Sequence, residues 1–410
     1  MNPAATAETV EIMRLGHAGD GIAADGLFVP YTVPGDVARV AREGARGRLI
    51  EIVRPGPARA TPPCSHFGRC GGCALQMMAR EPYLAWKRDL VVTALKQRGF
   101  DDAPVEGIRA VPPGTRRRAM FKARAIGKTV ALGFYEPESR NLVDISECPL
   151  LVPELARLIA PLKTQLAPIL APGETAELHA TATDAGVDLS VKLKRARGPD
   201  FLMALSELAS VLNLARLSWN GETVATARTP SLRIGRFTVG LPPESFLQPT
   251  KEGMRILQDL VREEVKGAGP IADLFSGCGT FALALAETHA VHAVDSGPAQ
   301  IEALIAAAKA GRANLTAETR DLYRRPLLAS ELSRFDTVVL DPPRPGASAQ
   351  AHALAQSSVP DVLYISCNPA SFARDARILA DGGYRVARVV SLDQFLWSPH
   401  VELFARFVRD

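Results

Sequence analysis

The C-terminal part of the chain alternates short apolar runs with helix-like segments, and this rhythm narrows the folds open to it. Four of the runs are too short for buried helices, namely 271–275, 291–295, 337–340 and 362–366. Segments with helical periodicity follow the first, second and fourth. Strands that alternate with helices form mainly parallel, doubly wound sheets. We therefore predict a Rossmann-like α/β domain over residues 241–410.

Two regions with other patterns precede this domain, as a chain of 410 residues allows. Residues 9–53 combine short alternating stretches with turn signals such as Asp25-Gly26 and Pro34-Gly35, which is typical of a small β-barrel. We expect this barrel within residues 1–58 and a central α+β domain within residues 59–240. The central domain is predicted to hold helices at 81–99 and 151–170, two strands within 121–144, and single strands at 187–193 and 232–239.

Bulk composition sets the class of protein. Apolar residues make up 47% and charged residues 22%, which are globular values. No apolar run reaches the roughly 18–20 uncharged residues that a membrane span needs. Glu8 and Glu11 lie in an N-terminus without an apolar core, so no secretory signal is predicted. We expect a cytoplasmic protein and take a monomer as the default.

Positive charge is concentrated between residues 61 and 150, which carry 14 basic and 9 acidic residues. The densest stretch is Arg116-Arg117-Arg118, followed by Lys122. Clusters of one sign attract phosphate backbones, although a solvated protein face is the competing interpretation. A second cluster comprises Lys192, Lys194, Arg195 and Arg197.

A glycine-containing loop follows the first predicted strand of the α/β domain. It runs from Asp273 to Thr280 as Asp-Leu-Phe-Ser-Gly-Cys-Gly-Thr and opens a helix, while Asp295 ends the next strand. Glycines let a ligand approach the backbone at a helix N-terminus, and an acidic residue about 20 positions on can hold a ribose. The loop departs from Gly-x-Gly-x-x-Gly and no Walker A motif is present, which disfavours dinucleotides and triphosphates. It resembles the adenosylmethionine loop of class I methyltransferases, although a glycine turn of another α/β protein is the alternative.

Two more strands end in residues with chemical potential. Asp341-Pro342-Pro343-Arg344 follows the third run and Ser366-Cys367-Asn368-Pro369 ends the fourth. Ligands of open α/β sheets bind beyond the carboxyl ends of the strands, so both loops should line one site. Arg344 stands where amino-group methyltransferases often carry an aromatic residue, which counts against N-methylation. Cys367 is a candidate nucleophile, and the competing interpretation is a cysteine that only packs in the apolar core. Glu402 is a candidate general base, and the competing interpretation is an ordinary surface glutamate.

Four cysteines form a separate group in the central region. They are spaced Cys-x5-Cys-x2-Cys with a distant Cys-Pro, at positions Cys64, Cys70, Cys73 and Cys148. Grouped cytoplasmic cysteines indicate metal rather than disulfides. Four thiolates suit zinc or a [4Fe–4S] cluster, and the lack of two close cysteine pairs favours iron–sulfur.

The ordered motifs Asp-Pro-Pro-Arg, Ser-Cys-Asn-Pro and Pro-His-Val-Glu, with Phe246-Leu247-Gln248 ahead of them, are similar to those of the RNA 5-methyluridine methyltransferases. The resemblance runs over nearly the whole chain. The N-terminal module resembles their TRAM domain, an OB-like RNA-binding barrel. The cysteine set resembles the iron–sulfur subgroup that modifies 23S ribosomal RNA.

The resemblance implies a mechanism and a set of site residues. A thiolate of Cys367 would add to uracil C6, C5 would take the methyl group of S-adenosylmethionine, and Glu402 would remove the C5 proton. The site should then favour the thiolate, since free cysteine has a pKa near 8.5. Asp341 would hold the uracil and touch the cofactor. The other cofactor-binding residues implied are Gln248, Phe275, Gly277, Thr280, Asp295 and Asp321, and the RNA-binding residues are Arg116, Arg117, Arg118, Lys122 and Arg344.

Other functions stay open at this point. A tRNA uracil-C5 methyltransferase would carry the same motifs, and Thr280 and Thr250 stand where the family often has asparagine. A methyltransferase acting on a small molecule or protein would leave the barrel and the arginines unexplained. A non-catalytic RNA-binding protein would have no need for the intact pair of Cys367 and Glu402.

Overall fold

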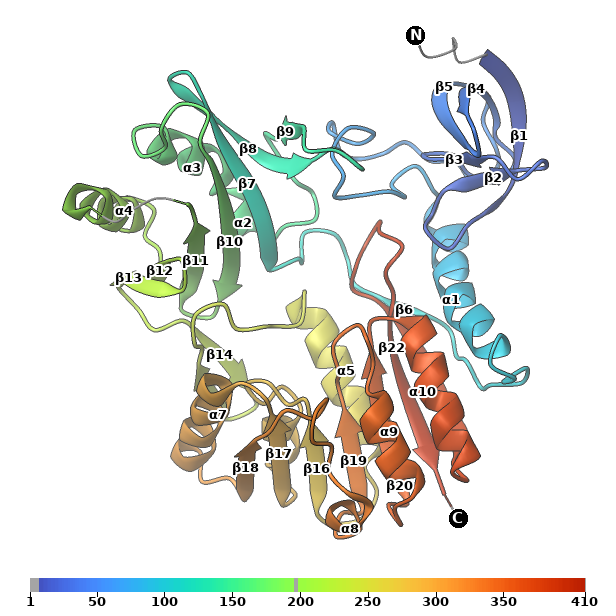
Figure 1. Cartoon of the computed structure of the whole chain (residues 1–410), viewed down its shortest axis with the longest axis vertical. Coiled ribbons are helices and arrows are strands. Elements are labelled where there is room, and N and C mark those ends of the chain that lie inside the picture. Colours follow the sequence, from blue (N-terminus) through green and yellow to red (C-terminus); the bar gives the residue numbers. More distant parts are fainter. Residues whose placement is uncertain (1–6, 195–197, 410) are drawn as a thin grey trace.

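The computed structural model describes residues 7–194 and 198–409, so Arg195 and Arg197 of the second basic cluster lie outside the described residues. Three sheet-bearing regions are arranged around a shared centre (Figure 1). The barrel lies at the upper right, a seven-stranded sheet at the upper left, and an eight-stranded sheet below both. The prediction of a mixed α/β chain with an N-terminal OB-like barrel is confirmed.

The barrel closes because alternate residues of five short strands point inward. Its strands are β1 (Ala7–Leu15), β2 (Gly21–Ala23), β3 (Phe28–Val29), β4 (Val37–Glu43) and β5 (Arg46–Arg54), in the order β1-β2-β3-β5-β4. Ile12, Val29 and Val40 fill its interior. Gly21 is required where it stands, because a Cβ there would lie 2.0 Å from the hydroxyl of Thr32.

The central sheet has the order β13-β12-β11-β10-β7-β8-β9 and packs against helices on one side. Its strands are β7 (Arg118–Ile126), β8 (Thr129–Tyr135), β9 (Leu142–Asp144), β10 (Thr175–Thr183), β11 (Gly186–Lys192), β12 (Arg216–Trp219) and β13 (Glu222–Thr226). Its helices are α2 (Pro153–Ala156), α3 (Ile159–Leu166) and α4 (Pro199–Val211).

The C-terminal sheet has the order β18-β17-β16-β19-β20-β22-β21-β6. Its strands are β16 (Ile271–Leu274), β17 (Val291–Asp295), β18 (Leu315–Thr319), β19 (Thr337–Leu340), β20 (Asp361–Ser366), β21 (Arg385–Asp393) and β22 (Glu402–Val408). Only β22 runs antiparallel to its neighbours. Its helices are α5 (Lys251–Glu264), α6 (Ala282–Leu285), α7 (Pro298–Ala310), α8 (Ala329–Leu332), α9 (Ser348–Ala355) and α10 (Pro369–Asp381).

Two elements from early in the chain join this C-terminal sheet. The edge strand β6 (Arg109–Ala110) pairs in parallel with β21, through Arg109 opposite Leu392. Helix α1 (Arg80–Lys96) lies beside α10 at the right of Figure 1, and its buried Val91 and Leu95 share a core with Phe407. The predicted central region 59–240 therefore includes segments that pack on the C-terminal sheet.

Local expectations were wrong at four places. The two strands expected within 121–144 are three, β7, β8 and β9. The segment 232–239 is a hairpin of β14 (Ser231–Ile234) and β15 (Phe237–Gly240), because Gly235 adopts φ 54° between them. The helical stretch 151–170 is split into α2 and α3. No helix was expected after the third apolar run, but α9 follows β19 once the loop that begins with Asp341–Arg344 has ended.

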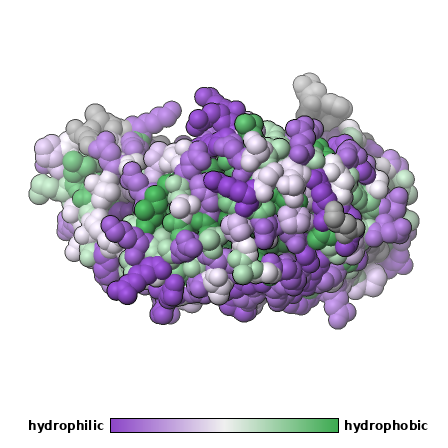
Figure 2. All heavy atoms as spheres, turned by 90° about the horizontal axis from the view of Figure 1, so that it is seen from below, coloured by the Kyte–Doolittle hydropathy of each residue, from purple (hydrophilic) through white to green (hydrophobic). Residues whose placement is uncertain are grey.

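Seen from below, the molecule presents mostly hydrophilic side chains, with hydrophobic residues in smaller groups between them (Figure 2). None of the described helices combines the length and the apolarity that crossing a membrane requires.

Candidate active site

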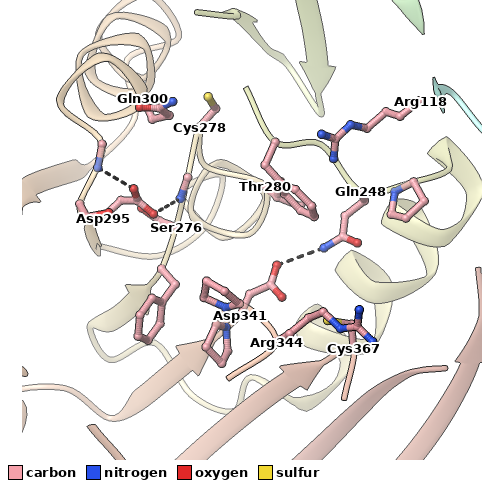
Figure 3. A pocket seen from close by; sticks show the side chains of 18 of the residues that line it. Arg118, Gln248, Ser276, Cys278, Thr280, Asp295, Gln300, Asp341, Arg344 and Cys367 are labelled. Atoms are coloured by element: carbon pink, nitrogen blue, oxygen red, sulfur yellow. Dashed lines mark hydrogen bonds between the residues drawn. The ribbon is translucent and has the colours of Figure 1, made fainter. Parts of the chain in front are cut away.

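A cavity of about 730 Å³ lies at the carboxyl ends of β16, β17, β19 and β20. The C-terminal sheet supplies most of its lining, and the facing wall comes from β7 and β10 through Arg118, Met120 and His179. Gln248 and Asp341 meet in the middle of the view in Figure 3, with Asp295 on one side and Cys367 and Arg344 on the other. The cavity therefore has two ends with different chemistry.

The Asp295 end is shaped by the glycine loop. The carboxylate of Asp295 accepts the backbone N–H of Gly277 at 2.9 Å and that of Gly297 at 2.8 Å (Figure 3). Phe275 adopts φ 64°, and its ring lies 5.6 Å from that of Tyr323. Aromatic rings beside a fixed carboxylate suit a ligand that joins a flat base to a hydroxyl-bearing sugar.

Other predicted residues of this end also line the cavity. Thr280 lies on its wall, and its carbonyl accepts the side-chain amide of Gln258 at 2.8 Å. Asp321 lines the cavity and also caps its own turn, accepting the N–H of Tyr323 at 3.0 Å. Thr250 has a structural role, since its hydroxyl caps α5 by accepting the N–H of Gly253 at 2.9 Å.

Three strand ends bring Cys367 and Glu402 to the other end and Asp341 to the middle of the cavity. Asp341 follows β19, Cys367 follows β20, and Glu402 opens β22 next to β20. Asn368 caps α10 by accepting the N–H of Ala370 at 3.1 Å, and Pro369 begins that helix. The turn that carries Cys367 is thereby fixed at a helix N-terminus.

Burial controls the titration of these groups. It raises the pKa of Asp341 to about 7 and, with the Asp341 carboxylate, that of Glu402 to about 8. Burial and the same carboxylates raise the pKa of the Cys367 thiol to about 11, while Arg344 opposes them. These shifts run opposite to the expectation that the site favours the thiolate, because burial first and the two carboxylates next outweigh Arg344.

A chain of side-chain amides joins the acidic groups. Gln248 donates from Nε2 to Oδ2 of Asp341 at 3.1 Å. Gln394 donates from Nε2 to Oε1 of Gln248 at 2.8 Å and to Oε2 of Glu402 at 2.7 Å. Gln248, Gln394 and Glu402 are buried, and Asp341 is half-buried.

The loop between β21 and β22 is held from the N-terminal half of the chain. The carbonyl of Trp397 accepts the N–H groups of Ala74 at 2.9 Å and Leu75 at 3.2 Å, and its own N–H donates to the Tyr83 hydroxyl at 2.7 Å. Lys87 and Asp393 form a fully buried ion pair beside it. The segment after Cys73 and helix α1 thus fix the loop that leads to Glu402.

The arginine run does not form one face. Arg116 and Arg118 line the cavity, and Arg118 stacks over the exposed ring of Phe246 at 4.8 Å. Arg117 points into the protein, is 1% exposed, and donates to the carbonyl of Gln248 at 2.9 Å. The prediction that Arg117 binds RNA is therefore corrected to a structural role.

The other two predicted RNA contacts lie nearer the surface. Lys122 is ion-paired with Glu177 on the neighbouring strand. Arg344 is exposed at the cavity mouth, where its guanidinium hydrogen-bonds His400 at 3.2 Å. Arg344 is thus the more available of these two cations for a phosphate.

The four predicted metal ligands are free, half-buried thiols. Cys73 lies within electrostatic reach of Cys64, Cys70 and Cys148. Among residues 7–194 and 198–409, however, no group of three or more His, Cys, Asp or Glu side chains is arranged so as to hold a metal ion. The iron–sulfur site stays a prediction.

Several cavity residues had no signal strong enough to single them out in the sequence. Tyr323 follows Asp321 in a loop without a motif, and His179 reaches the cavity from the central sheet. Gln394 lies behind the cavity and contacts it only through Gln248 and Glu402. Phe246 belongs to the Phe-x-Gln motif, and the structure places its 66% exposed side chain on the cavity lining.

Known proteins match this chain along its whole length. An "uncharacterized RNA methyltransferase" of Brucella suis is 44% identical over 402 residues, covering 97% of this chain and 96% of the relative. The 23S rRNA (uracil(1939)-C(5))-methyltransferase of Chromohalobacter salexigens is 33% identical over 434 residues, covering 99% of this chain and 90% of the relative.

A structure and a family model agree with these relatives. The crystal structure of Pyrococcus abyssi tRNA (uracil-54, C5)-methyltransferase with S-adenosyl-L-homocysteine has a TM-score of 0.78 and 26% identity, covering 98% of this chain and 100% of that chain. Residues 235–406 match the family model of the tRNA (uracil-5-)-methyltransferases. The cavity at the carboxyl ends of a doubly wound sheet agrees with these matches. The chain therefore belongs to the S-adenosylmethionine-dependent RNA uracil-C5 methyltransferases.

Proposed function

We propose that this enzyme forms 5-methyluridine in 23S ribosomal RNA through a covalent bond between Cys367 and C6 of the target uracil. The observation that carries the proposal is the meeting of Asp341, Cys367 and Glu402 in a single cavity. A nucleophile and a buried base on adjacent strand ends are the two groups that substitution at a uracil carbon requires.

The steps balance with these side chains alone around the base. Cys367 first loses its proton to solvent; the thiolate sulfur then adds to C6, and the electrons of the C5–C6 double bond move into the uracil carbonyl system as an enolate. S-adenosylmethionine supplies the electrophilic methyl group to which C5 then bonds. Glu402 takes the proton from C5, the C5–C6 double bond re-forms, and the C6–S bond breaks to release the Cys367 thiolate. The target base must leave its stack to enter the cavity.

The residues of the Asp295 end would hold the methyl donor. Asp295 is placed for the ribose hydroxyls, and Phe275 and Asp321 for the adenine. Gly277 and Thr280 would shape the loop around the amino-acid part. Gln248 and Asp341 lie between the two ends and would contact both donor and uracil.

The choice of 23S rRNA is supported by the Chromohalobacter salexigens relative, whose name states that target. Transfer RNA is the second candidate, since the Pyrococcus abyssi structure is of a tRNA methyltransferase. The experiment is to supply both RNAs, unmodified, with methyl-labelled S-adenosylmethionine and to identify the labelled nucleoside. Labelled 5-methyluridine in 23S rRNA alone supports the proposal. Label in tRNA alone favours the second candidate, and RNA binding without label indicates a non-catalytic protein.

RNA contacts at the cavity mouth predict a specific salt dependence. We expect Arg344→Gln to weaken RNA binding and to reduce the slope of log affinity against log salt by about one, because one phosphate contact is lost. Arg377→Gln is the matched control, since Arg377 lies on α10 and pairs with Asp381. Titrations at several salt concentrations measure both slopes. An unchanged slope for Arg344→Gln would remove this residue from the interface.

We also propose that Cys64, Cys70, Cys73 and Cys148 hold a [4Fe–4S] cluster and that the barrel of residues 1–58 is a TRAM-like RNA-binding domain. The donor chemistry suits the cluster, since the set consists of four free thiols. In the described part of the chain these thiols are not arranged to hold a metal ion, so binding the cluster would bring them closer together. Gln76 supports their arrangement, accepting the N–H of Cys64 at 3.2 Å and contacting the Cys73 thiol. The cluster would have a structural role, because methyl transfer needs no redox step.

The cluster proposal predicts a coloured protein. Purified without oxygen, the chain should contain iron and sulfide and absorb broadly in the visible range through thiolate-to-iron charge transfer. Cys148→Ser should lose both iron and colour, whereas Cys278→Ser should keep them, because Cys278 lies in the glycine loop far along the chain. Metal analysis and absorption spectra test this, and zinc in place of iron would contradict it.

A further inference from the structure

We propose that Gln394 is a positioning residue that fixes Glu402 and Gln248 relative to each other. The inference rests on the proposed function, since it assigns a role to a residue behind the two that would handle the uracil. Gln394 is 2% exposed and does not line the cavity. It therefore acts on the reaction only through its two partners.

The side-chain amide of Gln394 has one useful orientation. Its Nε2 lies between two oxygens, Oε1 of Gln248 at 2.8 Å and Oε2 of Glu402 at 2.7 Å. A flipped amide would turn its oxygen toward both acceptors and lose both bonds. Its own Oε1 is buried without a hydrogen-bond partner, so the two bonds that Nε2 donates are the hydrogen bonds that hold the amide in this orientation.

The orientation passes along the chain of amides. Because Oε1 of Gln248 accepts from Gln394, the Nε2 of Gln248 points to Asp341, which it reaches at 3.1 Å. Gln394 thus decides which hydrogen-bonding groups Gln248 presents to the cavity. It also sets the direction in which the free oxygen of Glu402 faces.

A glycine on α5 makes room for this amide. A Cβ at Gly253 would lie 2.4 Å from Oε1 of Gln394 and 2.7 Å from the Thr250 hydroxyl. Gly253→Ala should therefore displace the Gln394 amide without removing it. The titratable neighbours of Glu402 are Asp341 after β19 and Cys367 after β20, and Gly253→Ala changes neither of them.

The test compares Gln394→Leu with a matched control. We expect Gln394→Leu to lower kcat by about 100-fold, the order of loss when a change away from the reacting atoms misplaces a reacting group. The donor lowers the pKa of Glu402, so its loss should move the rise in rate to higher pH. With slower proton removal, methylated RNA should stay bonded to the protein on a denaturing gel.

Gln350→Leu is the control, because Gln350 is also buried and bonds both backbone groups of Leu327 away from the cavity. It should lower the melting temperature while leaving the pH profile and the gel unchanged. If Gln394→Leu does not fold, Gly253→Ala should show the same change in the pH profile.

The outcomes separate the inference from the proposed function. If Glu402→Gln accumulates the covalent complex but Gln394→Leu behaves like Gln350→Leu, the role of Gln394 is overturned and the proposed function stands. If wild-type protein cannot be trapped by 5-fluorouridine RNA and Glu402→Gln accumulates nothing, both fail. A shifted pH profile together with the persistent complex supports the assignment.

Discussion

Replacing Cys367 with alanine is expected to abolish methyl transfer and covalent capture of RNA together. Uracil C5 is a weak nucleophile, and the proposed addition at C6 is what activates it. Without the sulfur the reaction stops before the methyl group is transferred, so the rate of methylation should fall by about 10⁴-fold or more. Because Cys367 is outside the Asp295 end of the cavity, binding of S-adenosylmethionine should persist.

The measurement uses RNA that contains 5-fluorouridine. Fluorine at C5 cannot leave as a proton, so the wild-type adduct should survive on a denaturing gel. Cys367→Ser is the second variant, since a hydroxyl fills the same space but is a much poorer nucleophile. Both variants should give no shifted band, and both should keep the melting temperature of the wild-type protein. A band with Cys367→Ala would place the nucleophile elsewhere.

Replacing Glu402 with glutamine should stop the reaction one step later. The amide keeps the shape and can still contact Gln394, but it cannot accept the C5 proton. Turnover should fall by about 10²- to 10⁴-fold, the range for a lost general base. The distinctive result is a methylated covalent complex with ordinary uridine RNA, which mass spectrometry of the trapped peptide would show. Unmethylated adduct alone would assign Glu402 an earlier role.

The same variant has a signed effect on stability. The folded pKa of Glu402, about 8, lies above its unfolded value of 4.5, so folding favours the protonated form. That contribution is complete below pH 4.5 and is lost as the pH rises to 8. Glu402→Gln lacks the buried charge and should melt above wild type at pH 8, with a smaller difference at pH 5. For wild-type catalysis the sign is opposite, since only the carboxylate accepts a proton, and ionisation of Glu402 should speed proton removal from C5 up to about pH 8.

The part of the site that could be predicted from the sequence is the part that depends on local patterns. Asp341 and Cys367 follow apolar runs that are recognisable as parallel strands, and such strand ends share an edge. Arg117 was misjudged because neighbouring residues of an extended chain point in opposite directions, which a count of charges ignores. Gln394 and Tyr323 depend on contacts between distant segments, and no local pattern encodes those.

The pairing of β6 with β21 has a consequence for the order in which the protein can be made. Arg109 and its partner Leu392 are separated by about 280 residues, so the edge strand leaves the ribosome long before the sheet that receives it. Contacts of such long range close slowly, because the intervening chain must first be brought together. The barrel and the central sheet can form during translation, whereas α1 and β6 must wait beside them. The cavity that Asp341, Cys367 and Glu402 line is therefore completed only when synthesis is nearly finished, because its last strands are the last part of the chain to emerge.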